Sequence, residues 1–218
     1  MNLNCRGALR RKSIVNEYYV TPIAHVKLLQ GQIKYSDADA PITDQYYQFK
    51  AVNKNTKRVQ TIQCGMGVAR DFLKLTQCKP LPLFNPLQQN VANRNIQNGG
   101  INGRNNGNKN KISWNPKAKQ LYNAIMWIIV IWNGIKVDSP LYNIKEIVEK
   151  YATSAPFSSR IKGVNTIIRE TIGKDGSTLT DAINKLKDNN DIRNNVCDFS
   201  LLIPDLKDKD GKEIESYF

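Results

Sequence analysis

The sequence predicts an α+β protein, in which a small antiparallel sheet with one helix is followed by a helical bundle. Residues 45–52 and 58–64 have the composition of two strands and are joined by turn-favouring residues. Residues 90–110 hold nine asparagines and four glycines, so they cannot form a core. Residues 121–132 are apolar apart from Asn123, and we expect them to form a helix buried on all sides.

Composition divides the chain into a basic β-rich region (1–89), an Asn/Gly-rich linker or loop (90–112) and a helical region with a late strand (113–218). The net charge of +13 is uneven. Residues 1–120 hold 19 Lys and Arg against 5 Asp and Glu, whereas residues 121–218 hold 13 against 14. Codon bias would raise lysine and asparagine everywhere. A basic half beside a neutral half indicates a polyanion-binding surface.

The basic region is expected to begin with an arm or helix that runs toward Val15. Residues 18–21 and 23–35 are predicted to be extended, the second segment with a bend at Gly31. An acidic loop, residues 36–44, then leads into the hairpin formed by the two strands named above. His25 lies in an apolar stretch, where a core histidine with satisfied hydrogen bonds is the simplest interpretation.

Beyond the hairpin, Cys64 and Gly65 turn the chain into a predicted helix, residues 68–76. This layout resembles treble-clef zinc modules over about thirty residues, but it lacks three of the four zinc ligands, so we infer no site from it. The four cysteines form no CxxC pair, and we expect reduced thiols that serve as small apolar residues. They are Cys5, Cys64, Cys78 and Cys197.

Residues 79–87 contain three prolines among apolar residues, and we expect this strap to pack Leu81, Leu83, Phe84 and Leu87 onto the core. A proline-rich ligand for a partner is the functional alternative.

The helical region is predicted to hold three amphipathic helices after the buried one. They span residues 143–151 with Asn143 as N-cap, 160–173 with Ser158 or Ser159 as N-cap, and 179–189 opened by Ser177 and Thr178. Short strands are predicted at 134–137 and 196–203, and a loose tail apart from its end follows.

This order is compatible with a winged helix-turn-helix. In that interpretation, five side chains of one helix would face DNA, namely Ser158, Arg160, Lys162, Asn165 and Arg169. A helical bundle that binds no DNA explains the same pattern, and this half carries no net positive charge.

The sequence contains no phosphate-binding loop, GxSxG motif or HExxH motif, so no catalytic residue is assigned. One weak alternative is a metal-dependent nuclease, with Asp44 and Gln48 at a Mg²⁺ ion and Lys50 positioning water. Glu17, Asp37 and Asp39 could add ligands. The gap from Asp44 to Gln48 is short for adjacent strands, and glutamine brings no charge.

We therefore predict a non-enzymatic nucleic-acid-binding protein that needs no cofactor. Its basic half would contact phosphates, while three aromatic residues, Tyr46, Tyr47 and Phe49, could stack on bases of a single strand. The predicted phosphate contacts are Arg6, Arg10, Arg11, Lys12, Lys50, Lys54, Lys57 and Arg58, with Arg160 and Lys162 added by the winged-helix interpretation. An inhibitor or scaffold that binds an acidic protein partner is a third class.

The Asn- and Lys-rich composition is also typical of phage or mobile-element proteins. The N-terminus lacks an apolar h-region and no segment reaches membrane-spanning length, so we expect a cytoplasmic protein that does not act on membranes.

Overall fold

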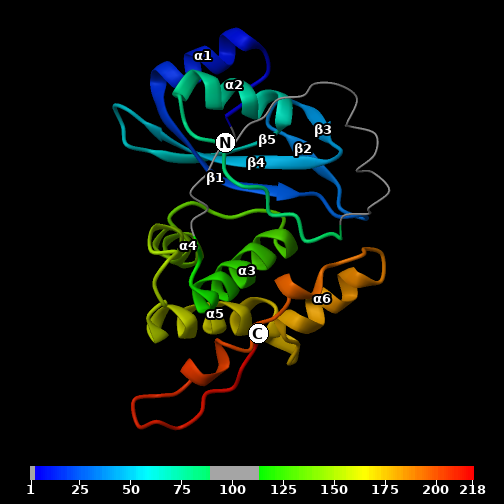
Figure 1. Cartoon of the computed structure of the whole chain (residues 1–218). Coiled ribbons are helices and arrows are strands. Elements are labelled where there is room, and N and C mark those ends of the chain that lie inside the picture. Colours follow the sequence, from blue (N-terminus) through cyan, green and yellow to red (C-terminus); the bar gives the residue numbers. More distant parts are fainter. Residues whose placement is uncertain (1–2, 89–112) are drawn as a thin grey trace, which may run out of the picture.

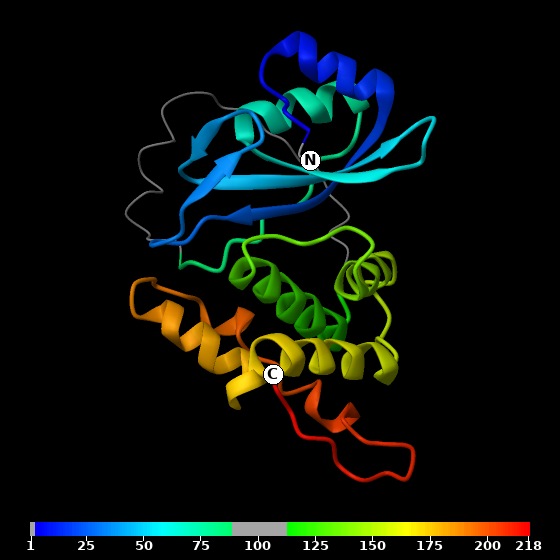
Figure 2. The ribbon, with the colours of Figure 1, turned by 180° about the vertical axis from the view of Figure 1, so that it is seen from behind.

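The computed structural model describes residues 3–88 and 113–218, and it arranges them in three layers (Figure 1). Two helices form the first layer, an antiparallel sheet forms the second, and the helical region forms the third. The view from behind shows the same order (Figure 2). The predicted α+β class is thus confirmed, whereas the predicted linker, residues 90–112, lies outside the described residues.

The sheet has β4 (Gln45–Asn53) at its centre, between β1 (Tyr18–Lys27) and β5 (Val59–Gly65). Both pairings are antiparallel, so the predicted hairpin of β4 and β5 is confirmed. Pro22 lies in the edge strand β1, next to an irregularity in its pairing with β4, where a missing N–H is tolerated.

A second, smaller hairpin forms where the sequence analysis expected a bend and an acidic loop. It pairs β2 (Lys34–Ser36) with β3 (Ala40–Ile42). Asp39 occupies the turn with a φ of 58°, a conformation that Asp adopts more readily than most residues.

Two helices, rather than the one predicted, cover one face of the sheet. They are α1 (Ala8–Glu17) and α2 (Met66–Thr76), which lie side by side in both views (Figures 1 and 2). The sequence predicts either an arm or a helix where α1 lies, because this segment has few apolar residues. Ile14 of α1 and Phe72 of α2 are fully buried against the sheet.

The other face of the sheet packs on α3 (Pro116–Ile131), the predicted apolar helix. Asn115 caps this helix by accepting the N–H groups of Lys117 and Ala118, and every residue from Gln120 to Val130 is buried. Ile23, Val26 and Tyr46 of the sheet belong to the same apolar cluster as α3. The two halves of the chain therefore share one core across this interface.

The remaining helices are α4 (Pro140–Lys150), α5 (Ser158–Thr171) and α6 (Leu179–Lys187), which pack around α3 (Figure 1). Single-turn 3₁₀ helices occur at Gly173–Asp175, Asn194–Val196 and Ile203–Asp205. The predicted start of α6 is confirmed, because Thr178 and Asp181 form a capping box.

Several predicted details of the helical region are wrong. The strands predicted at 134–137 and 196–203 are turns and 3₁₀ segments, because both segments pass around the ends of helices with no strand to pair with. Helix α4 begins earlier than expected, since Ser139 caps it with Pro140 at the first position. Phe157, rather than Ser158 or Ser159, occupies the N-cap of α5 without a side-chain hydrogen bond.

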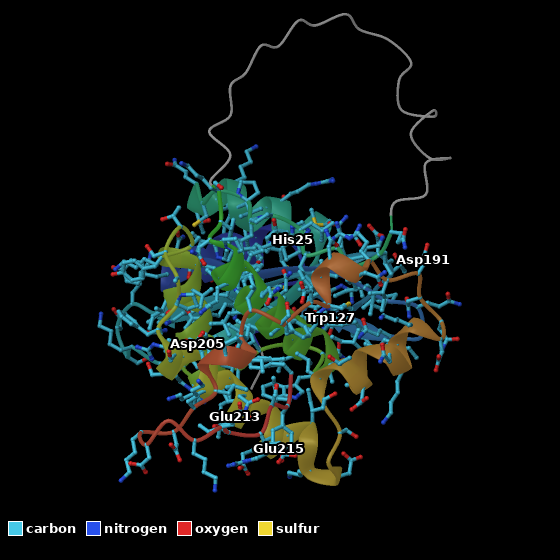
Figure 3. The ribbon with its side chains drawn as sticks, turned by 60° about the horizontal axis from the view of Figure 1, so that its bottom comes forward. His25, Trp127, Asp191, Asp205, Glu213 and Glu215 are labelled. Carbon is cyan, nitrogen blue, oxygen red and sulfur yellow. The ribbon has the colours of Figure 1, made fainter. Side chains whose placement is uncertain are left out.

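The end of the chain packs against α5, a contact that was not predicted. The Asn165 side chain donates to the Glu215 carbonyl at 2.8 Å and accepts the Tyr217 N–H at 2.8 Å, and Phe218 is buried. The view of this end of the molecule shows Asp205, Glu213 and Glu215 around it (Figure 3). Within the described residues, no helix is long and apolar enough to cross a membrane.

Candidate functional site

Helix α1 and the residues just before it carry four of the predicted phosphate contacts near the top of the molecule in Figure 1. Arg6, Arg10 and Lys12 are exposed. Arg11 is different, because its guanidinium lies 2.8 Å from the Asp71 carboxylate of α2 and donates to the Cys5 carbonyl at 3.1 Å. Arg11 therefore joins the two helices, and the other three cations are available to solvent.

The turn between β4 and β5 lies against the C-terminal end of α1. The Lys54 N–H donates to the Glu17 carbonyl at 2.9 Å, and the Lys54 ammonium donates to the Val15 carbonyl at 3.0 Å. A cation at this end of a helix is favoured by the helix dipole. Lys57 and Arg58 are exposed beside it. Two basic groups that are far apart in sequence are thus brought together.

We call this layer the basic face, and we define it as residues 3–17, 53–58 and 66–76. It holds nine Lys and Arg residues and only two acidic residues, Glu17 and Asp71. Those two pair with Arg10 at 3.9 Å and with Arg11 at 2.8 Å. Within the described residues, the other cations of this face have no carboxylate partner. They are Arg6, Lys12, Lys54, Lys57, Arg58, Arg70 and Lys74.

Lys50 does not belong to the basic face. Side chains of a strand alternate between the two faces of a sheet, and Lys50 points toward the helical region. Its ammonium lies 3.3 Å from the Asp138 carboxylate and 5.0 Å from the centre of the Tyr142 ring. Lys50 therefore connects the sheet to the helical region.

The expectation that aromatic residues of β4 stack on bases is wrong. Tyr46 and Tyr47 are each 1% exposed and Phe49 is 0% exposed, because both faces of the sheet are covered. Helices α1 and α2 pack on one face and α3 packs on the other. Tyr19, which it did not consider, is 60% exposed, with the Lys54 ammonium 5.3 Å from its ring centre.

Arg160 and Lys162 lie on α5, at the opposite end of the molecule from α1 (Figure 1). The structure therefore does not bring them together with the basic face. Two other residues of the predicted DNA-reading side of this helix are engaged within the protein. Ser158 donates to the Asp205 carboxylate at 2.6 Å, and Asn165 is buried under the chain end.

The residues of the nuclease alternative do not converge. Asp44 immediately precedes β4 and Gln48 lies within it. Their Cα atoms are therefore four steps apart along an extended chain, a distance of about 13 Å. The Gln48 side-chain oxygen accepts the Ile135 N–H at 2.9 Å. The Asp44 carboxylate pairs with the Lys27 ammonium instead. The hydrogen bond from Lys27 is the largest of the effects that lower the pKa of Asp44.

The additional carboxylates proposed for that metal site are also engaged elsewhere. Asp37 accepts the Gln63 N–H at 2.7 Å, Asp39 accepts from Asn4 at 2.8 Å, and Glu17 lies on α1. Within residues 3–88 and 113–218, no group of three or more His, Cys, Asp and Glu side chains could hold a metal ion. All four cysteines are free.

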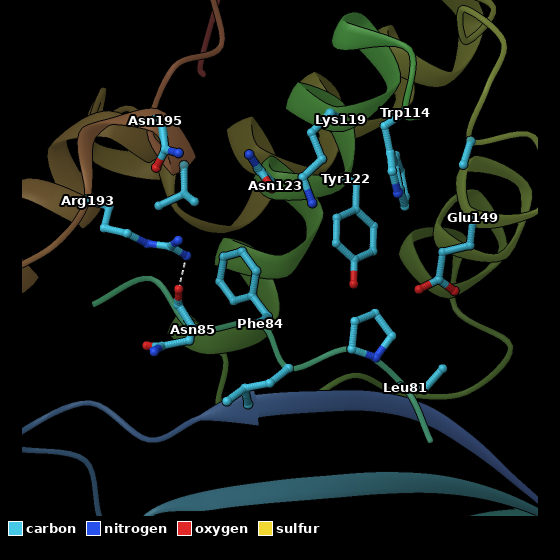
Figure 4. A pocket seen from close by; sticks show the side chains of 14 residues that line it. Leu81, Phe84, Asn85, Trp114, Lys119, Tyr122, Asn123, Glu149, Arg193 and Asn195 are labelled. Carbon is cyan, nitrogen blue, oxygen red and sulfur yellow. Dashed lines mark hydrogen bonds between the residues drawn. The ribbon is translucent and has the colours of Figure 1, made fainter. Parts of the chain in front are cut away.

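A cavity of about 560 Å³, which the sequence analysis did not anticipate, lies between the strap and α3 (Figure 4). The strap, residues 79–87, follows the edge of β1 through hydrogen bonds of Phe84 with His25 and Lys27. His25 itself is 8% exposed, and both ring nitrogens have hydrogen-bond partners, as predicted. Phe84 is buried, whereas Leu83 is 36% exposed and does not pack as expected.

Charged and aromatic side chains share this cavity, which we call the strap cavity. The Lys119 ammonium lies 5.0 Å from the centre of the Trp114 ring and 4.9 Å from that of Tyr122. Burial, and secondly the charge of Arg193, lower the pKa of Lys119. Burial, and secondly the charge of Glu149, raise the pKa of Tyr122. The sequence signal for this cavity was Asn123, a polar residue within an apolar helix.

Comparison with known proteins places the chain in a family without assigning an activity. No curated protein and no solved structure matches it. Residues 3–210 match the model of one family, which covers nearly the whole chain. The chain belongs to the family described as uncharacterised conserved protein UCP028583.

Proposed function

We propose that this protein binds nucleic acid without catalysis, through phosphate contacts of the basic face. The observation that carries the proposal is the convergence of α1 and the β4–β5 turn. Seven cations of this face have no carboxylate partner within the described residues. Phosphate contacts from lysine and arginine release counterions and supply most non-specific affinity for nucleic acid.

The contacts would be mainly to the backbone. The buried aromatic residues of β4 cannot read or stack on bases, and Tyr19 is the exposed ring nearest to Lys54. Backbone contacts position a protein on nucleic acid without selecting a sequence. We therefore propose weak sequence preference, and stacking of a single-stranded base only at Tyr19.

Two alternatives are weaker. The nuclease interpretation requires Asp44, Gln48 and Lys50 at one ion, and their side chains are engaged at three separate places. The winged-helix interpretation requires a strand after α6, where the chain forms turns and 3₁₀ helices, and it uses a helix end surrounded by carboxylates. An acidic protein partner would use the same basic face. The test below therefore distinguishes binding of nucleic acid from binding of an acidic protein.

The test is a binding titration with duplex DNA, single-stranded DNA and RNA of equal length at two salt concentrations. The informative variant combines Lys57→Asn with Arg58→Gln. Asparagine suits position 57, where φ is 59°. The matched control combines Arg160→Gln with Lys162→Gln, which removes the same charge from the other end.

We expect the Lys57/Arg58 variant to bind at least tenfold more weakly at low salt, and the control to change by less than about twofold. Equal losses in the two variants would contradict a localised face. Failure of all three nucleic acids to bind, with retention of an acidic protein, would favour the scaffold alternative.

A further inference from the structure

The strap cavity contains buried polar atoms that the protein itself does not satisfy. Asn123 is 2% exposed, and its side-chain oxygen has no hydrogen-bond partner among the described residues. The Nε of Arg193 is also buried and unpartnered within the same part of the chain. An unmet buried donor or acceptor costs about 1–3 kcal/mol. A polar ligand bound in the cavity could satisfy both this acceptor and this donor.

One end of the cavity is positively charged. Arg193 uses one terminal nitrogen to donate to the Asn85 carbonyl, drawn as the dashed line in Figure 4. Neither Arg193 nor Lys119 forms an ion pair with a carboxylate of the described residues. Burial, and secondly the nearby charge of Arg193, disfavour the charged form of Lys119 and lower its pKa. An anion placed between them would relieve this repulsion and could accept from the unpartnered Nε.

The wall between the two ends is aromatic. The Trp114 and Tyr122 rings lie 4.9 Å apart at 47°, and Figure 4 shows Tyr122 between Arg193 and Glu149. Glu149 forms the other end, where its carboxylate accepts from Lys145 at 2.7 Å. A carboxylate has several acceptor positions, so Glu149 retains capacity for a donor of a ligand.

We propose that the strap cavity binds a nucleoside monophosphate. The phosphate lies at Arg193 and Lys119, the planar base lies along Tyr122, and the donor edge of the base faces Glu149. A sugar hydroxyl donates to Asn123. A volume of about 560 Å³ is within the range of small-molecule sites. This site is separate from the basic face and does not depend on the function proposed there.

The test is calorimetric titration of the full chain with the four common nucleoside monophosphates. Guanosine, ribose 5-phosphate and inorganic phosphate serve as partial ligands. We expect at least one monophosphate to bind saturably. Each partial ligand should bind at least tenfold more weakly, because it lacks either the phosphate or the base. Quenching of Trp114 fluorescence, lost in Trp114→Phe, would place the ligand in this cavity.

Three variants locate the site. Lys119→Gln should weaken binding about tenfold or more, since a charge-assisted contact is lost. Lys136→Gln, an exposed lysine beyond α3, is the matched control and should have no effect. The Lys57/Arg58 variant should also bind the monophosphate normally, which separates this site from the basic face.

Two results would overturn the proposal. One is the absence of binding of any of the four monophosphates at millimolar concentration by protein whose unfolding transition shows it to be folded. The other is equal affinity for inorganic phosphate, because the aromatic wall would then contribute nothing. Loss of nucleic-acid binding in the Lys57/Arg58 variant bears only on the basic face.

Discussion

The sheet region (residues 3–88) and the helical region (residues 113–218) use their charged residues differently. Each of the five acidic residues of the sheet region has an interaction partner inside the protein, including Arg10, Arg11 and Lys27 for three of them. The excess cations therefore remain at the surface, mostly on the basic face. In the helical region, the numbers of basic and acidic residues are nearly equal. Carboxylates such as Asp205 and Glu215 lie at the end of the molecule opposite the basic face (Figure 3).

The difference teaches that net charge alone does not locate a binding surface. A net charge of +13 could be scattered evenly, but here the basic face of α1, α2 and one turn carries nine cations against two acids, a net +7, in one layer. The same layer has its own apolar cluster, with Phe49, Ile62 and Phe72 at 0% exposure. The face is therefore supported by a buried core, and its exposed cations Lys57 and Arg58 can be replaced without disturbing that core.

The largest expected effect concerns the core that joins the two regions. Trp127→Ala should lower the free energy of unfolding by about 3–5 kcal/mol, because it leaves a cavity in α3 and removes the hydrogen bond to the Val196 carbonyl. Trp132→Ala, at a site 38% exposed, should cost far less. Denaturant unfolding followed by circular dichroism measures both.

The same experiment examines whether the two regions are separate domains. Because Ile23, Val26 and Tyr46 pack in one cluster with α3, we expect Trp127→Ala to shift a single transition. Two transitions, with only one shifted, would show that the sheet region folds independently and that the regions share less than the packing suggests.

A smaller effect is expected at Gln48, which joins β4 to the loop after α3. Gln48→Met keeps the size of the side chain but removes the acceptor of the buried Ile135 N–H. We expect a loss of about 1–3 kcal/mol in the free energy of unfolding. Gln60→Met, on the neighbouring strand, is the control and should be nearly neutral. Equal effects would indicate that this hydrogen bond does not stabilise the interface.

The smallest effect depends on pH and involves Lys34, which is 2% exposed and donates to Asn133. Burial lowers the pKa of Lys34 from 10.5 to about 8. Between these values the unfolded chain binds more protons than the folded chain, so the free energy of unfolding should rise with pH. The contribution of Lys34 to this rise should be about 1 kcal/mol from pH 8 to 9.

The buried cysteines oppose this trend from about pH 8 upward, because an unfolded thiol with a pKa of 9.0 already loses protons there. Burial, its largest cause, raises the pKa of the Cys5 thiol from 9.0 to about 11, so the unfolded chain loses this proton first and stability falls. Urea titrations at pH 7.5, 8, 8.5 and 9 would measure the rise due to Lys34. The change from pH 8 to 9 should be less positive by about 1 kcal/mol in Lys34→Met than in the unsubstituted protein, and an identical pH dependence of the two proteins would contradict the assignment.

Much of the fold followed from local patterns. The apolar run 121–132 predicted α3, the composition around residues 53–57 predicted the hairpin, and Thr178 predicted the start of α6. Helix α1 was harder to predict, because only Ile14 of this helix is buried and most of its surface is polar. The predicted late strand at 196–203 is wrong, because Val196, Phe199 and Leu202 pack into the core cluster that contains α3 while the segment forms turns and 3₁₀ helices.

The sites were predictable only in part. Charge asymmetry indicated the half of the chain that carries the basic face, but the face of β4 on which Lys50 lies depends on tertiary packing. The strap cavity is lined by Phe84, Tyr122 and Arg193, residues that are far apart in sequence and that only the tertiary fold brings together. Only Asn123, a polar residue in an apolar run, pointed toward it.

The central claim is that cations at one end of the molecule bind nucleic acid, and lysine footprinting tests it most directly. The full chain is acetylated with and without bound nucleic acid, and modification at each lysine is measured by mass spectrometry. We predict that nucleic acid protects Lys12 and Lys57, while Lys174 and Lys187 of the helical region react equally in both states. Uniform protection, or protection limited to the helical region, would contradict the account.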